Sequence, residues 1–129
     1  MHAFRQAVEA QDFSAMEAML ADEVVFTSPV AFSPYRGKAL TAAILRNVFE
    51  VFENFRYVRE IGGDGHADHA LVFEAEVAGK KLTGCDFIHH DDTGLIDDFM
   101  VMVRPLSGAL ALSEQMGARF DKIRDEAGR

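Results

Sequence analysis

The amino-acid sequence predicts an α+β domain in which helices pack on one face of a curved antiparallel sheet. Two observations indicate this class. Apolar residues recur at helical spacing in the first half of the chain, whereas the second half alternates apolar and polar residues between glycine-containing turns. A last apolar stripe at helical spacing follows the alternating segments. Helices followed by an antiparallel meander and a further helix are typical of α+β domains.

The first half of the chain is expected to form three helices and a short strand. A helix begins near Phe4, and Asp12 can cap the next one, because its side-chain oxygen accepts a hydrogen bond from the first turn. Pro29 and Pro34 indicate an irregular loop, since residues before proline avoid helical angles, and Gly37 closes it. The expected elements are helices over 4–10, 13–20 and 39–52 and a strand over 24–27.

The second half is expected to form four strands and a last helix. From 71 to 77, apolar residues alternate with other residues, as in a strand with one buried face. Ala78-Gly79 is predicted to make a tight hairpin turn, and Pro105 is predicted to end the last strand. The expected elements are strands over 55–61, 71–77, 82–90 and 95–104 and a helix over 106–123.

The composition bounds the class of protein and its partners. With 129 residues, of which 49% are hydrophobic, the chain is expected to form one domain over 1–129. Its 21 acidic and 13 basic residues give a net charge of −8, which disfavours nucleic acid and anionic membranes as partners. No apolar run approaches the roughly 18 residues of a membrane span, and the N-terminus lacks the apolar region of a signal peptide. A cytoplasmic protein is therefore expected.

Neither a disulfide, a metal site nor a cofactor is expected. Cys85 is the only cysteine, which excludes an intrachain disulfide and a cysteine-rich zinc site. His89 and His90 are consecutive in a predicted strand, so their side chains point to opposite faces. His66 and His69 have a spacing that suits zinc only on a helix, and the neighbouring glycines argue against a helix there.

The order of elements and several short motifs resemble the nuclear transport factor 2-like superfamily, and within it the SnoaL-like polyketide cyclases and the ketosteroid isomerases. The motifs are Ala21-Asp22-Glu23, Ser28-Pro29-Val30, Pro34, Gly37 and the segment from Asp86 to Gly94. The resemblance covers most of the chain, although the C-terminal helix is longer than the isomerases carry. It implies a cystatin-like cone, in which the helices pack on the concave face of the curved sheet.

The resemblance also assigns three positions of the isomerase site. In that family a carboxylate base precedes a Pro-Val dipeptide, while a tyrosine and a protonated aspartic acid form an oxyanion hole. These positions are occupied by Ser28, Phe4 and Asp86, respectively. A serine without an adjacent base does not abstract a proton from carbon at a useful rate, and phenylalanine donates no hydrogen bond. Steroid isomerisation of the usual kind is therefore not expected.

An apolar ligand cavity is expected on the inward face of the sheet. Strand parity places Leu82, Gly84, Asp86 and Ile88 on this face, and Tyr35 lies in the loop at the expected mouth. Two alternatives stay open: the phenylalanines on this face are plain core, and Tyr35 packs on its own turn. The predicted ligand-binding residues are Phe4, Phe26, Ser28, Val30, Tyr35, Phe49, Phe52, Phe73, Ala75, Asp86, Ile88, Phe99, Val101 and Val103.

Asp86 is the candidate catalytic residue. Apolar neighbours should raise the pKa of its carboxyl, because burial disfavours the charged form. A neutral carboxylic acid can donate a hydrogen bond to a ligand oxygen, whereas the ionised form can serve as acid and base in a ring closure. The alternative is a structural carboxyl, held by a buried hydroxyl or backbone group. Asp97 and Asp98 are weaker candidates for water activation, because the Asp-Arg-Asp constellation which that chemistry needs is not expected inside the cone.

The outward face of the predicted sheet is apolar as well. Cys85, Phe87, Met100 and Met102 alternate away from the cavity face. An exposed apolar sheet face indicates a partner, and the resemblance implies a homodimer that forms through the sheet. The alternative is that the long C-terminal helix covers part of this face.

Three functions are consistent with the sequence. The first is a SnoaL-like protein that binds a small apolar molecule with a carbonyl, phenol or hydroxyl oxygen, with Asp86 as the acid or oxyanion donor of an isomerase or cyclase. The second is a binding protein without catalysis on the same scaffold. The third is a protein-interaction module. Substitution of Asp86 separates the first two, because it changes turnover in one and only affinity in the other.

Overall fold

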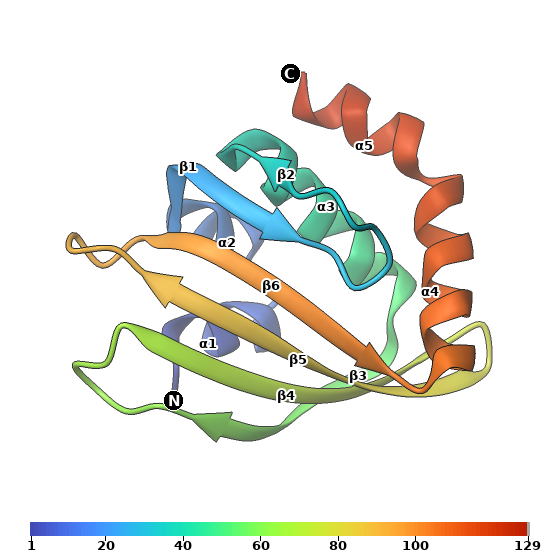
Figure 1. Ribbon diagram of the computed structural model, residues 1–129, viewed down its shortest axis with the longest axis horizontal. Coiled ribbons are helices and arrows are strands. Elements are labelled where there is room, and N and C mark those ends of the chain that lie inside the picture. The colour runs from blue at the N-terminus through green and yellow to red at the C-terminus, as the bar shows by residue number, and fades with distance from the viewer. Residues whose placement is uncertain (129) are drawn as a thin grey trace.

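Six strands form one curled sheet in the computed structural model, which describes residues 1–128 (Figure 1). The strand order is β2-β1-β6-β5-β4-β3. The elements are α1 (Ala3–Glu9), α2 (Phe13–Ala18), β1 (Leu20–Thr27), β2 (Tyr35–Arg36), α3 (Lys38–Val51), β3 (Glu53–Ile61), β4 (Asp68–Val77), β5 (Lys80–His90), β6 (Ile96–Arg104), α4 (Leu106–Ala118) and α5 (Phe120–Ala127). Arg129, the last residue of the predicted domain, lies outside the described residues.

Strands β3 to β6 form the predicted antiparallel meander. The connection between β4 and β5 is a two-residue turn, because Val77 and Lys80 are paired across the hairpin. Ala78 and Gly79 occupy this turn with φ angles of 50° and 79°. Two consecutive positive φ angles fit the right-handed twist of the flanking strands, so this turn sets the register of both. That register places alternate residues of β4 and β5 in the core, as the sequence predicts.

Strand β1 differs from the prediction in length and adds a parallel pair to the sheet. Leu20, predicted as the last residue of a helix, and the segment 21–23, predicted to lie between the helix and the strand, belong to the strand. It pairs in parallel with β6, and the Ile96 amide donates to the Met19 carbonyl at 2.8 Å. Leu20 and Val24 are fully buried in this arrangement. Burial and strand pairing therefore override the local preference of an alanine- and acid-containing segment for helix.

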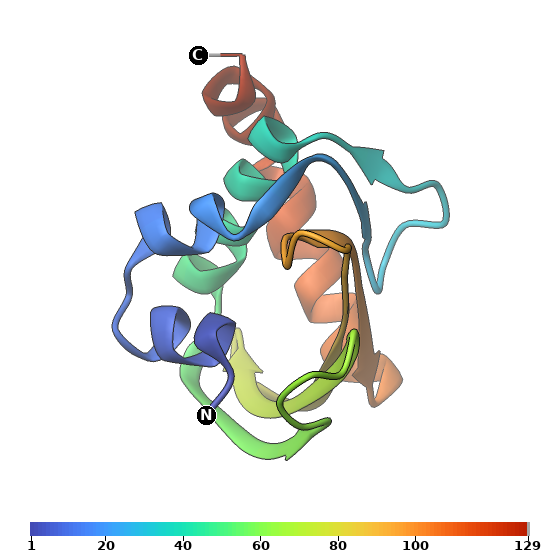
Figure 2. The same ribbon diagram turned by 90° about the vertical axis from the view of Figure 1, so that its left-hand side faces the viewer.

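The sheet curls, and helices α1, α2 and α3 lie across its concave side (Figure 2). The hydrophobic core lies between these layers, where Phe4 of α1 contacts Phe99 of β6 with ring centroids 5.1 Å apart. Helix α4 packs against β4, β5 and β6. The predicted α+β class, with helices on the concave face of a curved sheet, is confirmed.

The predicted C-terminal helix is broken into α4 and α5 at Arg119. Helix α5 packs on α3, where Ile123 is fully buried. The buried Asn47 links α3 to α5 and to the residue at the break. The Asn47 side-chain amide donates to Glu126 Oε2 at 3.1 Å, and Arg119 Nη1 donates to Asn47 Oδ1 at 3.3 Å. The apolar stripe continues through the break, which is why periodicity alone does not reveal it.

The outward sheet face carries the predicted apolar side chains. Phe87 is 38% exposed and Met102 is 54% exposed. Gly108 of α4 lies against Leu82, an inward-facing residue of β5, so α4 packs on the concave side rather than on this face. A homodimer through the sheet stays a prediction. No helix within residues 1–128 is long and apolar enough to cross a membrane.

Candidate functional site

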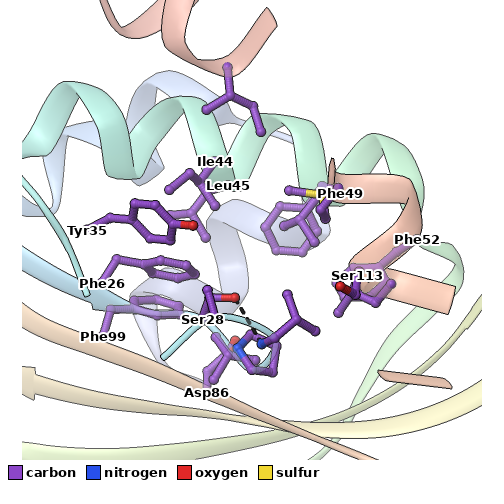
Figure 3. Close-up of a pocket in the computed structure, with 18 of the residues that line it drawn as sticks. Phe26, Ser28, Tyr35, Ile44, Leu45, Phe49, Phe52, Asp86, Phe99 and Ser113 are labelled. Carbon is purple, nitrogen blue, oxygen red and sulfur yellow. Dashed lines mark hydrogen bonds between the residues drawn. The ribbon is translucent and has the colours of Figure 1, made fainter. Parts of the chain in front are cut away.

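A cavity of about 210 Å³ lies between the concave face of the sheet and helices α3, α4 and α5 (Figure 3). Aromatic rings dominate its wall: Phe26 and Phe99 lie on one side, and Phe49 and Phe52 on the other. The residues that line it are Phe26, Ser28, Pro29, Val30, Ala31, Tyr35, Ile44, Leu45, Val48, Phe49, Phe52, Phe55, Phe73, Asp86, Phe99, Val101, Leu112, Ser113, Met116, Gly117, Phe120 and Ile123.

Ten of the predicted ligand-binding residues line this cavity, and four do not. The ten are Phe26, Ser28, Val30, Tyr35, Phe49, Phe52, Phe73, Asp86, Phe99 and Val101. Phe4 is fully buried behind Phe99 and does not reach the cavity. Ile88 and Ala75 share the inward face of the sheet but lie outside the cavity, as does the half-buried Val103.

Ile88 and Ala75 lie outside the cavity because helices cover both ends of the inward sheet face. Ile88 pairs with Phe99, on which α1 packs through Phe4. Ala75 pairs with Leu82, on which α4 packs through Gly108. Strand parity identifies the correct face, but it does not show where helices lie directly on that face. Only the middle of the sheet is open to the cavity.

The C-terminal helices supply a wall that the predicted set does not include. Leu112, Met116, Phe120 and Ile123 belong to the apolar stripe predicted for the last helix, and Ser113 lies beside them. The stripe is therefore visible in the sequence. Its location over the cavity depends on the break at the end of α4 and on the packing of α5 against α3.

Asp86 lies in the middle of β5, between Leu71 of β4 and Val101 of β6. Its side chain is buried, and its Oδ2 accepts a hydrogen bond from the Tyr57 hydroxyl at 3.0 Å. Burial raises the pKa of the Asp86 carboxyl to about 7, although the hydrogen bond from Tyr57 opposes the rise. Near pH 7 this carboxyl therefore exists in both protonation states, and it lines the cavity in each.

Tyr57 contacts Asp86 but is not among the predicted ligand-binding residues. The carboxyl was expected among apolar neighbours alone, whereas a buried hydroxyl holds one of its oxygens. This contact is the one anticipated by the structural alternative for Asp86. Burial and the nearby carboxyl raise the pKa of Tyr57, so its hydroxyl stays a proton donor. The signal in the sequence is the alternation of Phe55 and Tyr57 with the exposed Arg56 and Val58 in β3.

The loop before α3 brings two hydroxyl groups to the cavity. The Ser28 hydroxyl accepts a hydrogen bond from the Val30 amide at 3.1 Å, which stabilises the turn (Figure 3). The Tyr35 ring packs against the Phe120 ring in a tilted arrangement, with centroids 5.7 Å apart. Among the described lining residues, Asp86 is the only carboxylate, and none is a histidine or lysine. Ser28 therefore has no histidine or lysine partner among these lining residues.

The other titratable candidates lie outside the cavity. Asp97 and His89 form a pair with a 2.6 Å contact, and this hydrogen bond raises the pKa of His89. Asp98 pairs with His89 across the sheet and does not line the cavity either. Burial raises the pKa of the Cys85 thiol, so the thiol is not activated as a nucleophile.

A curled sheet that encloses an apolar cavity with helices is the architecture of the nuclear transport factor 2-like class of proteins. The SnoaL-like domain model matches residues 1–99, and the chain belongs to this family. A comparison with curated proteins finds no match.

Solved structures agree with this assignment. A steroid delta-isomerase from Pseudomonas aeruginosa is 39% identical, with a TM-score of 0.86 over 92% of this chain and 87% of that chain. An uncharacterised protein with a cystatin-like fold from Silicibacter pomeroyi is 35% identical, with a TM-score of 0.85 over 96% of this chain and 91% of that chain. A SnoaL-like protein from Burkholderia thailandensis is 16% identical, with a TM-score of 0.65 over 80% of this chain and 90% of that chain. At this identity, the similarity shows a shared fold and no shared function.

Proposed function

We propose that this protein binds a small, mostly apolar molecule in the cavity and that Asp86 hydrogen bonds to an oxygen of that molecule. The observation that carries the proposal is a buried carboxyl in an otherwise largely apolar wall, with its pKa raised by burial to about 7. A cavity lined by aromatic and aliphatic side chains with a few polar groups is the usual form of a small-molecule site. A polar group inside such a site selects a ligand with a complementary atom.

The two protonation states of Asp86 recognise different oxygens. Protonated Asp86 can donate a hydrogen bond to a carbonyl, whereas ionised Asp86 can only accept one from a phenol or an alcohol. Tyr57 donates to Oδ2 and fixes the plane of the carboxyl, which makes Tyr57 a positioning residue. A carbonyl ligand therefore prefers the acid form, and a phenol prefers the ionised form.

Transfer of a proton next to a carbonyl, in an isomerisation or a cyclisation, is the reaction class that we propose for this site. A carboxyl with a pKa near 7 can both release and accept a proton near neutral pH. The similarity to the steroid delta-isomerase from Pseudomonas aeruginosa supports this class, because the comparison covers 92% of this chain at 39% identity.

Binding without catalysis is the second candidate. The residues at the two other positions that the isomerase resemblance assigns, Phe4 and Ser28, favour it. Phe4 is fully buried and lies outside the cavity, and the Ser28 hydroxyl is engaged with the Val30 amide. Without a base at Ser28, only Asp86 is left among the described lining residues to move a proton on carbon.

Binding is tested with an aromatic ketone and a phenol of matched size, measured by calorimetry between pH 5.5 and 8.5. The ketone is expected to lose affinity above pH 7, up to about tenfold per pH unit, because Asp86 loses the proton that it donates. The phenol is expected to gain affinity over the same range. In Asp86→Asn both pH dependences should disappear.

Asp92→Asn is the matched control, because it makes the same chemical change at an exposed turn residue. It should leave both pH dependences intact. Equal affinities of wild type and Asp86→Asn for both probes at every pH would overturn the role of Asp86. Failure of both probes to bind wild type would overturn the small-molecule proposal for these ligand classes.

Turnover is tested with a β,γ-unsaturated ketone, followed by the absorbance of the conjugated product. With this steroid-isomerase type of substrate, wild type is expected to stay near background, because Ser28 supplies no base at the position that the isomerase resemblance assigns. Ser28→Asp places a carboxylate at this position and should raise the rate by about 100-fold, whereas Ser28→Asn should not. Wild-type turnover that Asp86→Asn abolishes would contradict this expectation and would favour catalysis by Asp86 over binding alone.

A further inference from the structure

Three histidines that are far apart in the sequence meet outside the cavity. His2 precedes α1, His69 lies in β4, and His90 ends β5. The ring centroids are 4.7 Å apart for His2 and His69 and 5.2 Å apart for each other pair. One ring nitrogen from each histidine lies within 4.8 Å of the other two, and all three side chains are half-buried. None of these residues lines the cavity.

Hydrogen bonds to the backbone determine which ring nitrogen of His69 and His90 is free. His69 Nε2 lies 3.1 Å from the Gly63 carbonyl, and His90 Nδ1 lies 3.1 Å from the Ala67 carbonyl. A carbonyl only accepts, so these nitrogens carry the ring protons, and His69 Nδ1 and His90 Nε2 keep their lone pairs. Histidines that bind a metal through one ring nitrogen commonly donate a hydrogen bond from the N–H of the other to a carbonyl in this way.

The free nitrogen of His69 has no partner in the structure. Its Nδ1 is buried and makes no hydrogen bond with the described residues. Buried polar atoms are almost always paired, and an orphaned one indicates a site for a bound water or ion. The His69 ring lies against Gly62. A Cβ at position 62 would lie 2.6 Å from His69 Cδ2, so only glycine leaves room for the ring.

His2 completes the group from the other layer of the fold. Its backbone amide donates to Glu60 Oε1 at 3.1 Å, and its Nδ1 accepts from the Phe4 amide at 3.0 Å. Because Nδ1 accepts this hydrogen bond, it carries a ring lone pair, as a metal-binding imidazole requires.

We propose that His2, His69 and His90 form a binding site for a divalent transition metal, with Zn²⁺ as the ion that suits three imidazoles. Zinc binds nitrogen at about 2.0–2.1 Å, which places tetrahedral ligands about 3.4 Å apart. The present spread of up to 4.8 Å must therefore contract when the ion enters. Three protein ligands leave the fourth tetrahedral position to water.

Metal binding would change the start of α1. If His2 coordinates through Nδ1, its lone pair is no longer available to the Phe4 amide. If it coordinates through Nε2, the ring proton moves to Nδ1, which then cannot accept either. The Phe4 amide loses its present acceptor in both cases. This amide is therefore a local reporter that distinguishes the three-histidine site from binding elsewhere.

The test uses the full chain without an affinity tag, freed of metal with a chelator. Zn²⁺ is titrated in competition with a chromophoric chelator, and Co²⁺ is followed by its visible absorption. One ion per chain is expected, with a tetrahedral Co²⁺ spectrum and a shift of the Phe4 amide resonance. His69→Gln and His90→Gln should each weaken Zn²⁺ binding at least tenfold.

His66→Gln and His89→Gln are the matched controls, because these histidines lie outside the group of three. They should keep the affinity of wild type. The thermal midpoint of each metal-free variant is measured, and the wild-type Phe4 resonance tests the site without any substitution. The proposal is overturned if wild type binds neither ion, if the control variants lose as much affinity as the others, or if the Phe4 resonance does not respond.

Discussion

Asp86→Asn is expected to be more stable than wild type at pH 8, and this advantage should shrink as the pH falls. Folding raises the pKa of Asp86 from 3.8 to about 7, so the folded state binds a proton that the unfolded state has released. The stability of wild type therefore falls as the pH rises from about 4 to about 7 and levels off above that. The full contribution is on the order of 4 kcal/mol, at 1.36 kcal/mol for each pH unit.

The measurement is the free energy of unfolding from urea denaturation at pH 5 and pH 8. The difference between Asp86→Asn and wild type should grow by about 2–3 kcal/mol between these two values. At each pH, the difference in unfolding free energy between Asp86→Asn and wild type removes the contribution of the titratable groups that both proteins share. Asp92→Asn provides the matched exposed change and should follow wild type. A difference that stays constant from pH 5 to pH 8 would show that Asp86 titrates normally in the folded protein.

Gly84→Ala is expected to destabilise the protein by about 2–3 kcal/mol through overpacking. Gly84 is paired with Phe73, whose ring lies across it: a Cβ at Gly84 would lie 2.2 Å from Phe73 Cζ. The ring has little freedom to move, because Phe52 and Phe55 contact it with centroids 5.5 and 4.9 Å away. Since Phe73 lines the cavity, a displaced ring would also change the space for a ligand.

A double-mutant cycle with Phe73→Leu tests this cause. The smaller side chain leaves room for the new methyl group, so the double variant should lose less stability than the sum of the two single variants. Gly117→Ala is the control, because a Cβ there meets nothing within 4 Å and alanine favours helix. Equal stability of Gly84→Ala and wild type, or strict additivity with Phe73→Leu, would rule out the predicted clash.

Local patterns predict the elements of this fold well, and pairing in space explains what they miss. The alternation in β4 and β5 identifies the inward face and Asp86, because period two is a property of the strand itself. The parallel partner of β1 and the break at Arg119 depend on segments distant in the chain.

The same limit applies to the two candidate sites. Tyr57 belongs to β3 and reaches Asp86 of β5 across the width of β4. A carboxyl with apolar sequence neighbours therefore has a polar partner that no spacing rule reveals. The histidine group shows this more strongly. His66 and His69, or His89 and His90, are the pairs that spacing suggests, whereas the fold combines His69 and His90 with His2.

The division of the cavity wall between two parts of the chain has a consequence for how such proteins diversify. The SnoaL-like match ends at residue 99, and it includes the sheet face with Asp86 and the loop with Ser28 and Tyr35. The opposite wall is shared between α3, which lies inside the match, and α4 and α5, which lie beyond that boundary. Substitutions in α4 and α5 are therefore expected to change the shape of the cavity while Asp86 stays in place on β5.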